Sequence, residues 1–240
     1  MDMTHSVRPV RAVLFDKDGT LIDFQKTWGP WAAQSIRDLA VKTGAAASQI
    51  AETLRFDLAH EAFHRDSPVI AGTPDDLAGL LACYLPELSP REILTLITPD
   101  AGSVTLAPVA GLVEMHAALG AAGIAQGVVT NDFEGETRGQ IRDLGLDGVF
   151  GVVIGYDSGH GGKPAPEGCL AAARALGSDP RDTVMVGDSL HDLNAGRAAG
   201  MRTVAVLTGV AVEADLSPYA DVVLASIADL PAWIARQGTA

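Results

Sequence analysis

Residues 10–21 read Val10-Arg11-Ala12-Val13-Leu14-Phe15-Asp16-Lys17-Asp18-Gly19-Thr20-Leu21, and this stretch decides the fold of the 240-residue chain. Its apolar first half predicts a buried strand, and two aspartates one residue apart follow where that strand ends. Gly19 favours a turn there, because glycine adopts backbone angles that other residues resist. Alternate residues of an extended chain lie on the same side, so Asp16 and Asp18 are expected close together. Two carboxylates that close need a proton or a cation between them.

A helical block follows the first strand. From residue 24 to about residue 99 the apolar residues recur at helical spacing, beginning with Trp28 and Trp31. Thr73-Pro74 and Ser89-Pro90 each place a capping residue before a proline at the first helical position. The stretch therefore predicts an all-α block of about 80 residues with about four helices.

Beyond Pro108, β-rich apolar runs alternate with helical stretches. Expected strands cover 124–129, 149–154, 183–186, 203–207 and 221–224, and expected helices cover 112–119, 133–144, 166–176, 190–199 and 227–235. Such alternation indicates βαβ units and a parallel sheet, which the first strand joins across the inserted block. We predict an α/β fold: a doubly wound, Rossmann-like parallel sheet core (1–22 and 104–240) with an inserted α-helical cap domain (23–103).

The composition limits the partners of this protein. A net charge of -13 and a pI near 4.7 argue against binding to nucleic acid or to an anionic membrane, because polyanions would be repelled. No apolar run reaches the roughly 18 residues that a membrane span needs, and no signal peptide is visible. The two cysteines, Cys83 and Cys169, do not make a disulfide framework. We expect a cytoplasmic protein.

Polar residues follow four of the expected strands, at the point where each strand ends. Open parallel sheets bind ligands at this edge. A structural core does not need such a convergence, so we predict a functional site there. Its residues are Asp16 and Asp18, then Thr130 and Asn131, then Lys163 after a glycine-rich loop, and finally Asp188, Ser189 and Asp192.

This set of residues contains the ligands for a small hard cation. Asp16 and Asp188, with a backbone carbonyl near Asp18, offer oxygen atoms that suit octahedral Mg²⁺. The histidines are scattered and no His/Cys set is placed to hold zinc. We therefore predict a Mg²⁺ site formed by Asp16, Asp18 and Asp188.

The same residues contain the parts for phosphoryl transfer. Lys163 is a point cation suited to a phosphate oxygen. Thr130 offers a hydroxyl, Asn131 an amide, and backbone N–H groups around Gly19 are further donors. A nucleophilic carboxylate, a second carboxylate for proton transfer, a metal and these donors suit a reaction through an aspartyl-phosphate. The metal and the lysine would reverse the sign of the charge locally, so an acidic protein can still bind an anionic substrate.

At this point the motifs resemble those of the haloacid dehalogenase superfamily, in order and spacing across the whole core. The matching segments are Asp16-Lys17-Asp18-Gly19-Thr20-Leu21, Thr130-Asn131, Lys163-Pro164 and Gly187-Asp188-Ser189-Leu190-His191-Asp192. The position of the cap is similar to that in the C1-capped subfamily. The resemblance implies these roles: Asp16 as nucleophile, Asp18 as general acid/base, Thr130 and Lys163 as phosphate binders, Asp188 as a Mg²⁺ ligand with Asp16, and Asp192 as a supporting carboxylate that orients Lys163 or a metal-bound water.

Within that subfamily the chain looks most like the phosphoglycolate phosphatase group, through residues 163–167 and 192–200. Two positions depart from the pattern of that group. Lys17 stands where a small apolar residue is common, and Asp23-Phe24 where Asp-Ser is common. From strand alternation we expect Lys17 to point away from both neighbouring aspartates, toward the other face of the sheet or the cap hinge.

The leading hypothesis is a Mg²⁺-dependent phosphatase acting on a small phosphomonoester, phosphoglycolate-like or a sugar phosphate, as a monomer or homodimer. The alternative is a phosphomutase of the β-phosphoglucomutase type. A dehalogenase would need neither Mg²⁺ nor Asp18, and an inactive phosphoprotein-binding module would not need the whole motif set. A cap that closes over the substrate would contact it. The candidates for this contact are Lys26, Trp28, Trp31, Arg37, Arg55 and Arg65, each of which could equally belong to the cap core or surface.

Overall fold

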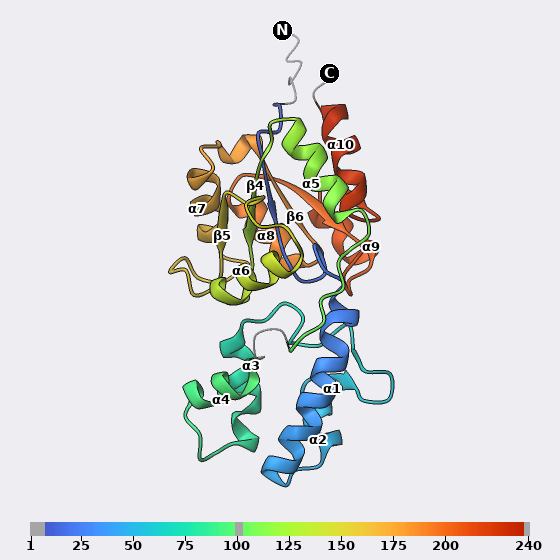
Figure 1. Ribbon diagram of the computed structural model, residues 1–240, viewed down its shortest axis with the longest axis vertical. Coiled ribbons are helices and arrows are strands. Elements are labelled where there is room, and N and C mark those ends of the chain that lie inside the picture. Colours follow the sequence, from blue (N-terminus) through green and yellow to red (C-terminus); the bar gives the residue numbers. More distant parts are fainter. Residues whose placement is uncertain (1–7, 99–102, 238–240) are drawn as a thin grey trace.

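The computed structural model describes residues 8–98 and 103–237. Within them the main sheet has six parallel strands in the order β5-β4-β1-β6-β7-β8. They are β1 (Ala12–Phe15), β4 (Ala125–Val129), β5 (Val152–Ile154), β6 (Thr183–Gly187), β7 (Arg202–Val206) and β8 (Val222–Leu224). The strand order confirms that the first strand joins the later ones, because β1 pairs with both β4 and β6 at the centre of the sheet. The predicted α/β, doubly wound fold is confirmed (Figure 1).

Helices cover both faces of this sheet (Figure 1). They are α5 (Leu112–Ala121), α6 (Glu134–Asp143), α7 (Glu167–Ala175), α8 (Leu190–Ala198), α9 (Glu213–Leu216) and α10 (Leu230–Gln237). The helices α5 to α8 agree with the helical stretches of the sequence to within a few residues, whereas the one-turn helix α9 was not predicted. The last one differs at its start, because residues 227–229 form a 3₁₀ turn before α10 begins.

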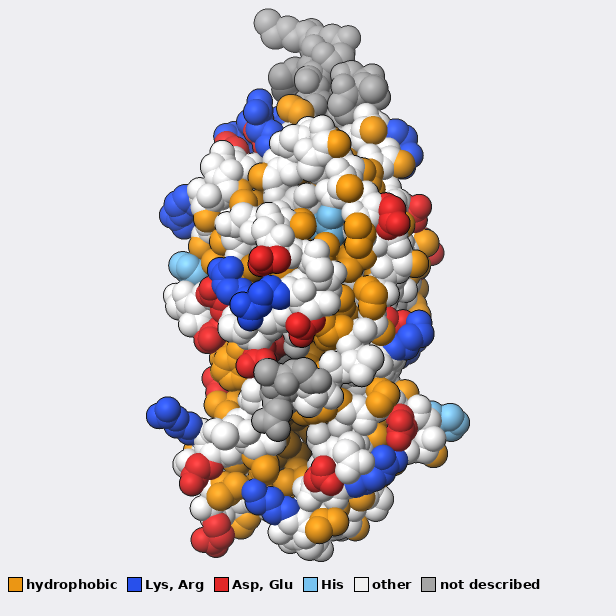
Figure 2. Space-filling model, in the orientation of Figure 1, with side chains coloured by type: hydrophobic (Ala, Val, Ile, Leu, Met, Phe, Trp, Pro, Cys, Tyr) orange, Lys and Arg blue, Asp and Glu red, His pale blue; other side chains and the backbone are white. Residues whose placement is uncertain are grey.

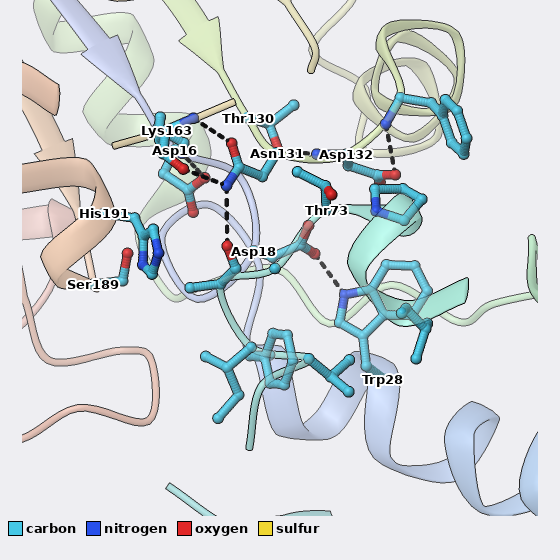
Figure 3. A pocket seen from close by; sticks show the side chains of 18 of the residues that line it. Asp16, Asp18, Trp28, Thr73, Thr130, Asn131, Asp132, Lys163, Ser189 and His191 are labelled. Carbon is cyan, nitrogen blue, oxygen red and sulfur yellow. Dashed lines mark hydrogen bonds and ion pairs between the residues drawn. The ribbon is translucent and has the colours of Figure 1, made fainter. Parts of the chain in front are cut away.

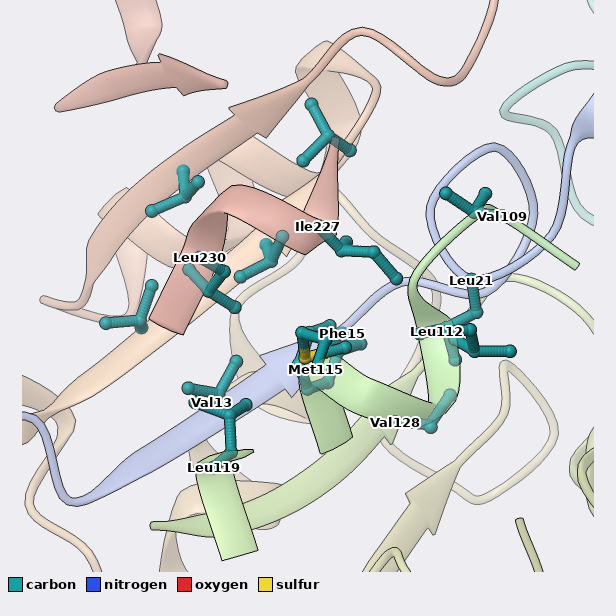
Figure 4. Packing of buried hydrophobic residues seen from close by; sticks show 14 of the residues in the cluster. Val13, Phe15, Leu21, Val109, Leu112, Met115, Leu119, Val128, Ile227 and Leu230 are labelled. Atoms are coloured by element: carbon teal, nitrogen blue, oxygen red, sulfur yellow. The ribbon is translucent and has the colours of Figure 1, made fainter. Parts of the chain in front are cut away.

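The alternation of side chains along β1 supplies both layers of the core. Val13 and Phe15 point to the face covered by α5, α6 and α10, and they pack with Met115 and Leu119 (Figure 4). Leu14 points to the opposite face, where small residues of α7 and α8 pack closely. Because both faces are covered, β1 is apolar throughout, and only the residue after its last position is charged.

A second unit, between β1 and β4, has its own apolar cluster. Its helices are α1 (Phe24–Thr43), α2 (Ala47–Thr53), α3 (Pro74–Leu81) and α4 (Pro90–Ile97). Thr73 and Ser89 form the capping boxes that start α3 and α4, as their Pro-containing patterns predict. The block is not all-α, however, since a short hairpin joins β2 (Phe56–Asp57) to β3 (Ala62–Phe63). Two-residue strands are too short for a period-2 pattern to reveal them.

Two stretches of backbone join this unit to the sheet, and they lie side by side. The Asp23 N–H donates to the Ala107 carbonyl over 2.8 Å, and Ile22 bridges Pro108. The division into 1–22 with 104–240 and 23–103 stays a prediction, and the segment 99–102 lies outside the described residues. Among the described helices, none has the length and apolarity to cross a membrane.

Candidate active site

The site lies where the carboxyl ends of the central strands face the helical unit (Figure 3). Asp16 follows β1, Thr130 follows β4 and Asp188 follows β6, while Lys163 comes from the loop after β5. All four line one cavity of ≈ 150 Å³. The parallel register of β4, β1 and β6 brings these residues together, because equivalent ends of neighbouring strands meet at one edge.

Three buried carboxylates form the acidic centre of this cavity. Oxygen atoms of Asp16, Asp188 and Asp192 all lie within 4.8 Å of one another. Burial raises the pKa of Asp16 to about 7, against the opposing effect of Lys163, and burial likewise raises the pKa of Asp188. These hard oxygen donors are buried and close together, and their negative charge exceeds the positive charge of Lys163. Such a set suits a divalent cation, so the donor chemistry agrees with a Mg²⁺ site. The third member of the cluster is Asp192, where the sequence suggested Asp18.

Lys163 is the cation within this centre. Its Nζ donates to Asp16 Oδ1 over 2.5 Å, to Asp192 Oδ1 over 2.6 Å and to the Val129 carbonyl over 2.8 Å. An ammonium has three hydrogens, so every one of them has an acceptor. Burial opposes the charge on Lys163, but the two carboxylates outweigh it and raise its pKa. Lys163 is therefore charged and fixes the orientation of the Asp16 carboxylate.

Asp192 supports Lys163 from the first turn of α8. Its Oδ2 accepts from the Ser189 N–H over 3.0 Å and from the Ser189 hydroxyl over 2.6 Å, which leaves Oδ1 for Lys163. A Cβ on Gly187 would lie 2.2 Å from the Cβ of Asp192, so only glycine allows this approach. The contact fits the expectation that Asp192 orients Lys163, and its supporting role stays a prediction.

Asp18 faces the helical unit and not the acidic centre (Figure 3). Trp28 Nε1, from α1, donates to Asp18 Oδ1 over 2.5 Å, and Lys17 Nζ lies 2.8 Å from Asp18 Oδ2. This carboxylate, held by an indole N–H and an ammonium, lies at the boundary between the two units and lines the cavity. Its side chain takes no part in the cluster of Asp16, Asp188 and Asp192.

The expected direction of Lys17 is wrong with respect to Asp18. Besides Asp18, the Lys17 ammonium contacts Asp132 over 2.8 Å and Gln140 over 2.5 Å, and its side chain is fully buried. β1 ends at Phe15, so the alternation of an extended strand no longer governs the next residues. Burial opposes the charge of Lys17, but Asp18 and Asp132 raise its pKa.

Two predicted phosphate donors already have internal partners. The Asn131 amide donates to the carbonyls of Ala71 and Lys163, each over 3.0 Å, so both of its hydrogens are used. The Gly19 N–H donates to the Ile22 carbonyl over 2.8 Å. These contacts give both residues a positioning role, and their part in phosphate binding stays a prediction. Thr130 is different, since its hydroxyl lines the cavity and accepts one bond from the Asp132 N–H.

Gly19 shapes the site in another way. Its φ is +87°, and a Cβ there would lie 2.4 Å from Asp188 Oδ2. Gly209, after β7, has the same effect from the other side, since its Cβ would overlap the Asp188 carboxylate. The carbonyl of Gly19 accepts from the Thr208 hydroxyl over 2.7 Å. Two glycines thus leave room for a buried Asp188.

Sequence reasoning missed Asp132, Gln140, Thr208 and Gly209. Asp132 carries a visible signal, because it directly follows Thr130-Asn131 at the end of β4. Thr208 and Gly209 follow the end of β7, so the rule that polar groups gather at carboxyl ends also identifies them. Gln140 lies on α6 and has no local signal, since only the fold brings it to Lys17.

Known proteins resemble this chain over most of its length. The model of the haloacid dehalogenase-like hydrolases matches residues 10–200. A phosphoglycolate phosphatase of Xylella fastidiosa is 36% identical over 208 residues, which cover 83% of this chain and 81% of that protein. An N-acetylmuramic acid 6-phosphate phosphatase of Pseudomonas aeruginosa is 30% identical over 213 residues, covering 83% of each.

Among solved structures, a HAD phosphatase from Thermococcus onnurineus superposes with a TM-score of 0.67 at 24% identity, covering 94% of this chain and 98% of the other. This structural similarity supports the fold, while the sequence matches show the family. The chain belongs to the haloacid dehalogenase-like hydrolase family.

Proposed function

We propose that this hydrolase is a Mg²⁺-dependent phosphatase that acts on a small phosphomonoester through an aspartyl-phosphate on Asp16. The observation that carries the proposal is the orientation of Asp16: Lys163 holds its Oδ1 in a buried cavity whose other wall contains Asp18. The phosphatase names of the two relatives support the same reading.

The proposed metal site uses Asp16 and Asp188, with Asp192 nearby. A bound Mg²⁺ would neutralise these carboxylates and withdraw charge from a phosphoryl group between them. This requirement explains why the protein tolerates three buried acids with one lysine, since the set carries more negative than positive charge.

The covalent steps fall to two aspartates. In the first, an Asp16 oxygen forms a bond to phosphorus while the bond from phosphorus to the ester oxygen breaks, and Asp18 gives its proton to that leaving oxygen. In the second, Asp18 takes a proton from water, the water oxygen bonds to phosphorus, and the bond to Asp16 breaks. Lys163 and Thr130 line the same cavity, and in this proposal they share the charge of the phosphoryl oxygens.

Asp18 must exchange partners to play this role. Its bonds to Trp28 and Lys17 hold it at the cavity wall. We propose that substrate entering between the two units takes the place of the Trp28 indole as the partner of Asp18.

The proposal predicts phosphate release that requires Mg²⁺ and Asp16. Asp16→Asn should lower kcat by at least about a thousandfold, because a carboxamide cannot act as the nucleophile. The measurement is inorganic phosphate released from a panel of phosphomonoesters, with and without EDTA. The circular dichroism spectrum of the variant serves as a control for folding.

Hydrolysis by Asp16→Asn at the wild-type rate would mean that another group attacks phosphorus. The same assay separates the alternative of a phosphomutase, which would return an isomerised sugar phosphate and little inorganic phosphate. The division into core and cap, the monomeric or homodimeric state and the cytoplasmic location stay predictions of the sequence.

A further inference from the structure

The wall of the active-site cavity on the helical unit is apolar. Aromatic and aliphatic side chains from α1, the β2–β3 hairpin, the loop before α3, and α3 and α4 line it. Among them are Phe24, Trp28, Trp31, Phe63, Val69 and Ile70. A leaving group in front of Asp18 would contact this wall, so the wall determines which alcohols fit.

The cations of the helical unit do not reach the cavity. The lysine and three arginines that the sequence offered as substrate contacts are each paired with an acid elsewhere. The pairs are Lys26 with Asp23 (2.6 Å), Arg37 with Glu61 (3.1 Å), Arg55 with Asp66 (2.8 Å) and Arg65 with Asp215 (2.6 Å). The two tryptophans on the same list do line the cavity. The active-site cavity is thus lined by the tryptophans of this unit and by none of these four cations.

A carboxylate on the leaving group would find no cation free to hold it. Lys163 is the one lysine or arginine among the described residues that line the cavity, and its contact with Asp16 places it at the phosphate end, away from the apolar wall. The lining imidazole, His191, lies beside Ser189 at the phosphate end (Figure 3). Asp132 and Glu136 on the core side would repel a second negative charge.

The apolar wall continues into a second cavity of ≈ 240 Å³ inside the helical unit. The two cavities share Trp31, Phe63, Val69, Leu77 and Ile97, so the side chains that lie between them are apolar. A buried apolar space of about 150 Å³ suffices to bind benzene. In Figure 2 the lower part of the molecule is hollowed over apolar side chains. Two exposed side chains of opposite charge, Asp38 and Lys42, line the second cavity as well.

We propose that the substrate is the phosphate ester of an uncharged, apolar alcohol of at least benzene size. The inference rests on the proposed function and names its substrate class. The phosphate would lie against Asp16 and Lys163, and the carbon chain or ring would pass Trp28 and Trp31 into the second cavity. A carboxylated alcohol of the glycolate type is disfavoured by the same wall.

The test is a series of n-alkyl phosphates from ethyl to hexyl, with phosphoglycolate as the charged counterpart of ethyl phosphate. The alkyl esters have leaving oxygens of nearly equal basicity, so the series measures apolar burial. We expect kcat/KM to rise with every methylene, by up to about fourfold for each one that is fully buried. Phosphoglycolate should fall below ethyl phosphate. A flat series, or phosphoglycolate above all alkyl esters, would overturn the inference.

Failure of the proposed function gives a different result, since no ester in the series would then release phosphate with Mg²⁺. A product test uses the unaltered protein: 1-hexanol should inhibit phosphate release at lower concentration than glycolate. Stronger inhibition by glycolate would count against the apolar substrate.

A variant places a cation in the shared wall. Ile97 ends α4, where a lysine suits the helix dipole, so Ile97→Lys should fold. It should lower kcat/KM for hexyl phosphate at least tenfold and raise the ratio of phosphoglycolate to hexyl phosphate. Val41→Lys is the matched control, because Val41 is 87% exposed on α1 and lines neither cavity. Equal effects of the two lysines on the chain-length series would contradict the proposal.

Discussion

At the scale of single residues, Lys17 links the two units of the molecule. It is fully buried, and its ammonium touches Asp18, Asp132 and Gln140 while lying 5.3 Å from the centre of the Trp28 ring. A lysine in this place holds Asp18 toward the helical unit and compensates Asp132. The position therefore affects both stability and the proton transfer proposed for Asp18.

Lys17→Met should lower both the stability of the protein and its kcat. Removing one partner of a buried ion pair leaves its carboxylates uncompensated, so the free energy of unfolding should fall by about 3 kcal/mol in urea titrations. kcat should fall by roughly tenfold to a hundredfold with a smaller change in KM, because Asp18 loses its orientation. Tryptophan fluorescence should change as well, since the Trp28 ring loses the nearby charge.

Lys26→Met is the control for that variant. Lys26 forms an exposed ion pair with Asp23, and such pairs contribute no more than about 1 kcal/mol. If the two variants lost equal amounts of stability and kcat, Lys17 would contribute no more than an exposed lysine. Its assignment as a positioning residue would then be wrong.

At the scale of elements, a buried polar contact joins α5 to β4. His116 Nδ1 and Gln126 Oε1 are 2.5 Å apart, and Gln126 Nε2 donates to the His116 carbonyl over 3.2 Å. The ring packs edge-on against Phe15 and Phe150. Burial lowers the pKa of His116, so its neutral form belongs to the folded state.

The lowered pKa of His116 makes the stability of the fold depend on pH. The unfolded chain binds a proton at His116 near pH 6.5 while the folded chain resists it, so stability is lost as the pH falls below about 6.5. The loss from this group is at most about 1.4 kcal/mol per pH unit. His116→Gln keeps a donor for Gln126 and does not titrate. Urea midpoints at pH 7 and pH 5 should therefore differ less in this variant than in the wild type. An equal or larger difference in the variant would contradict the account.

Most elements could be predicted from the sequence, because their apolar runs are long or end in clear stop signals. β1 and its neighbours follow from buried apolar stretches, and α3 and α4 follow from their Thr-Pro and Ser-Pro caps. The β2–β3 hairpin could not be predicted, because its stability comes from the packing of Phe56 on Phe63 at 4.8 Å and not from a local pattern.

The candidate site divides in the same way. The strand-end rule identified Asp16, Asp188 and Lys163, because sheet topology alone brings them together. The use of the Asn131 amide, which anchors Ala71 and the backbone of Lys163, depends on where the helical unit packs. No sequence pattern gives that packing, and the same holds for the bond from Trp28 to Asp18.

At the scale of the whole molecule, an acidic chain of net charge -13 concentrates uncompensated charge at one buried point. A divalent cation that binds only the folded state stabilises it by mass action. With Mg²⁺ at about 100 times its Kd, the stabilisation is about 2.7 kcal/mol, and the unfolding temperature should rise by about 5–10 °C.

Asp188→Asn tests that statement without any turnover assay. The amide is nearly isosteric and removes one of three close carboxylates, so the metal-free variant should be at least as stable as the wild type. Its unfolding temperature should no longer respond to Mg²⁺. A full Mg²⁺ shift in this variant would place the metal elsewhere.

The central claim is that Asp16 becomes phosphorylated, and the most direct measurement traps that state. Asp18→Asn is mixed with an aryl phosphate labelled in its phosphoryl group, because a phenolate can leave without a proton from Asp18. The reaction is quenched in acid, the protein is digested, and the labelled peptide is identified by mass spectrometry. The account predicts label on Asp16, because without Asp18 the second step lacks its base. Adding Asp16→Asn should abolish the label. Label on another residue, or wild-type turnover of Asp18→Asn without label on Asp16, would contradict the account.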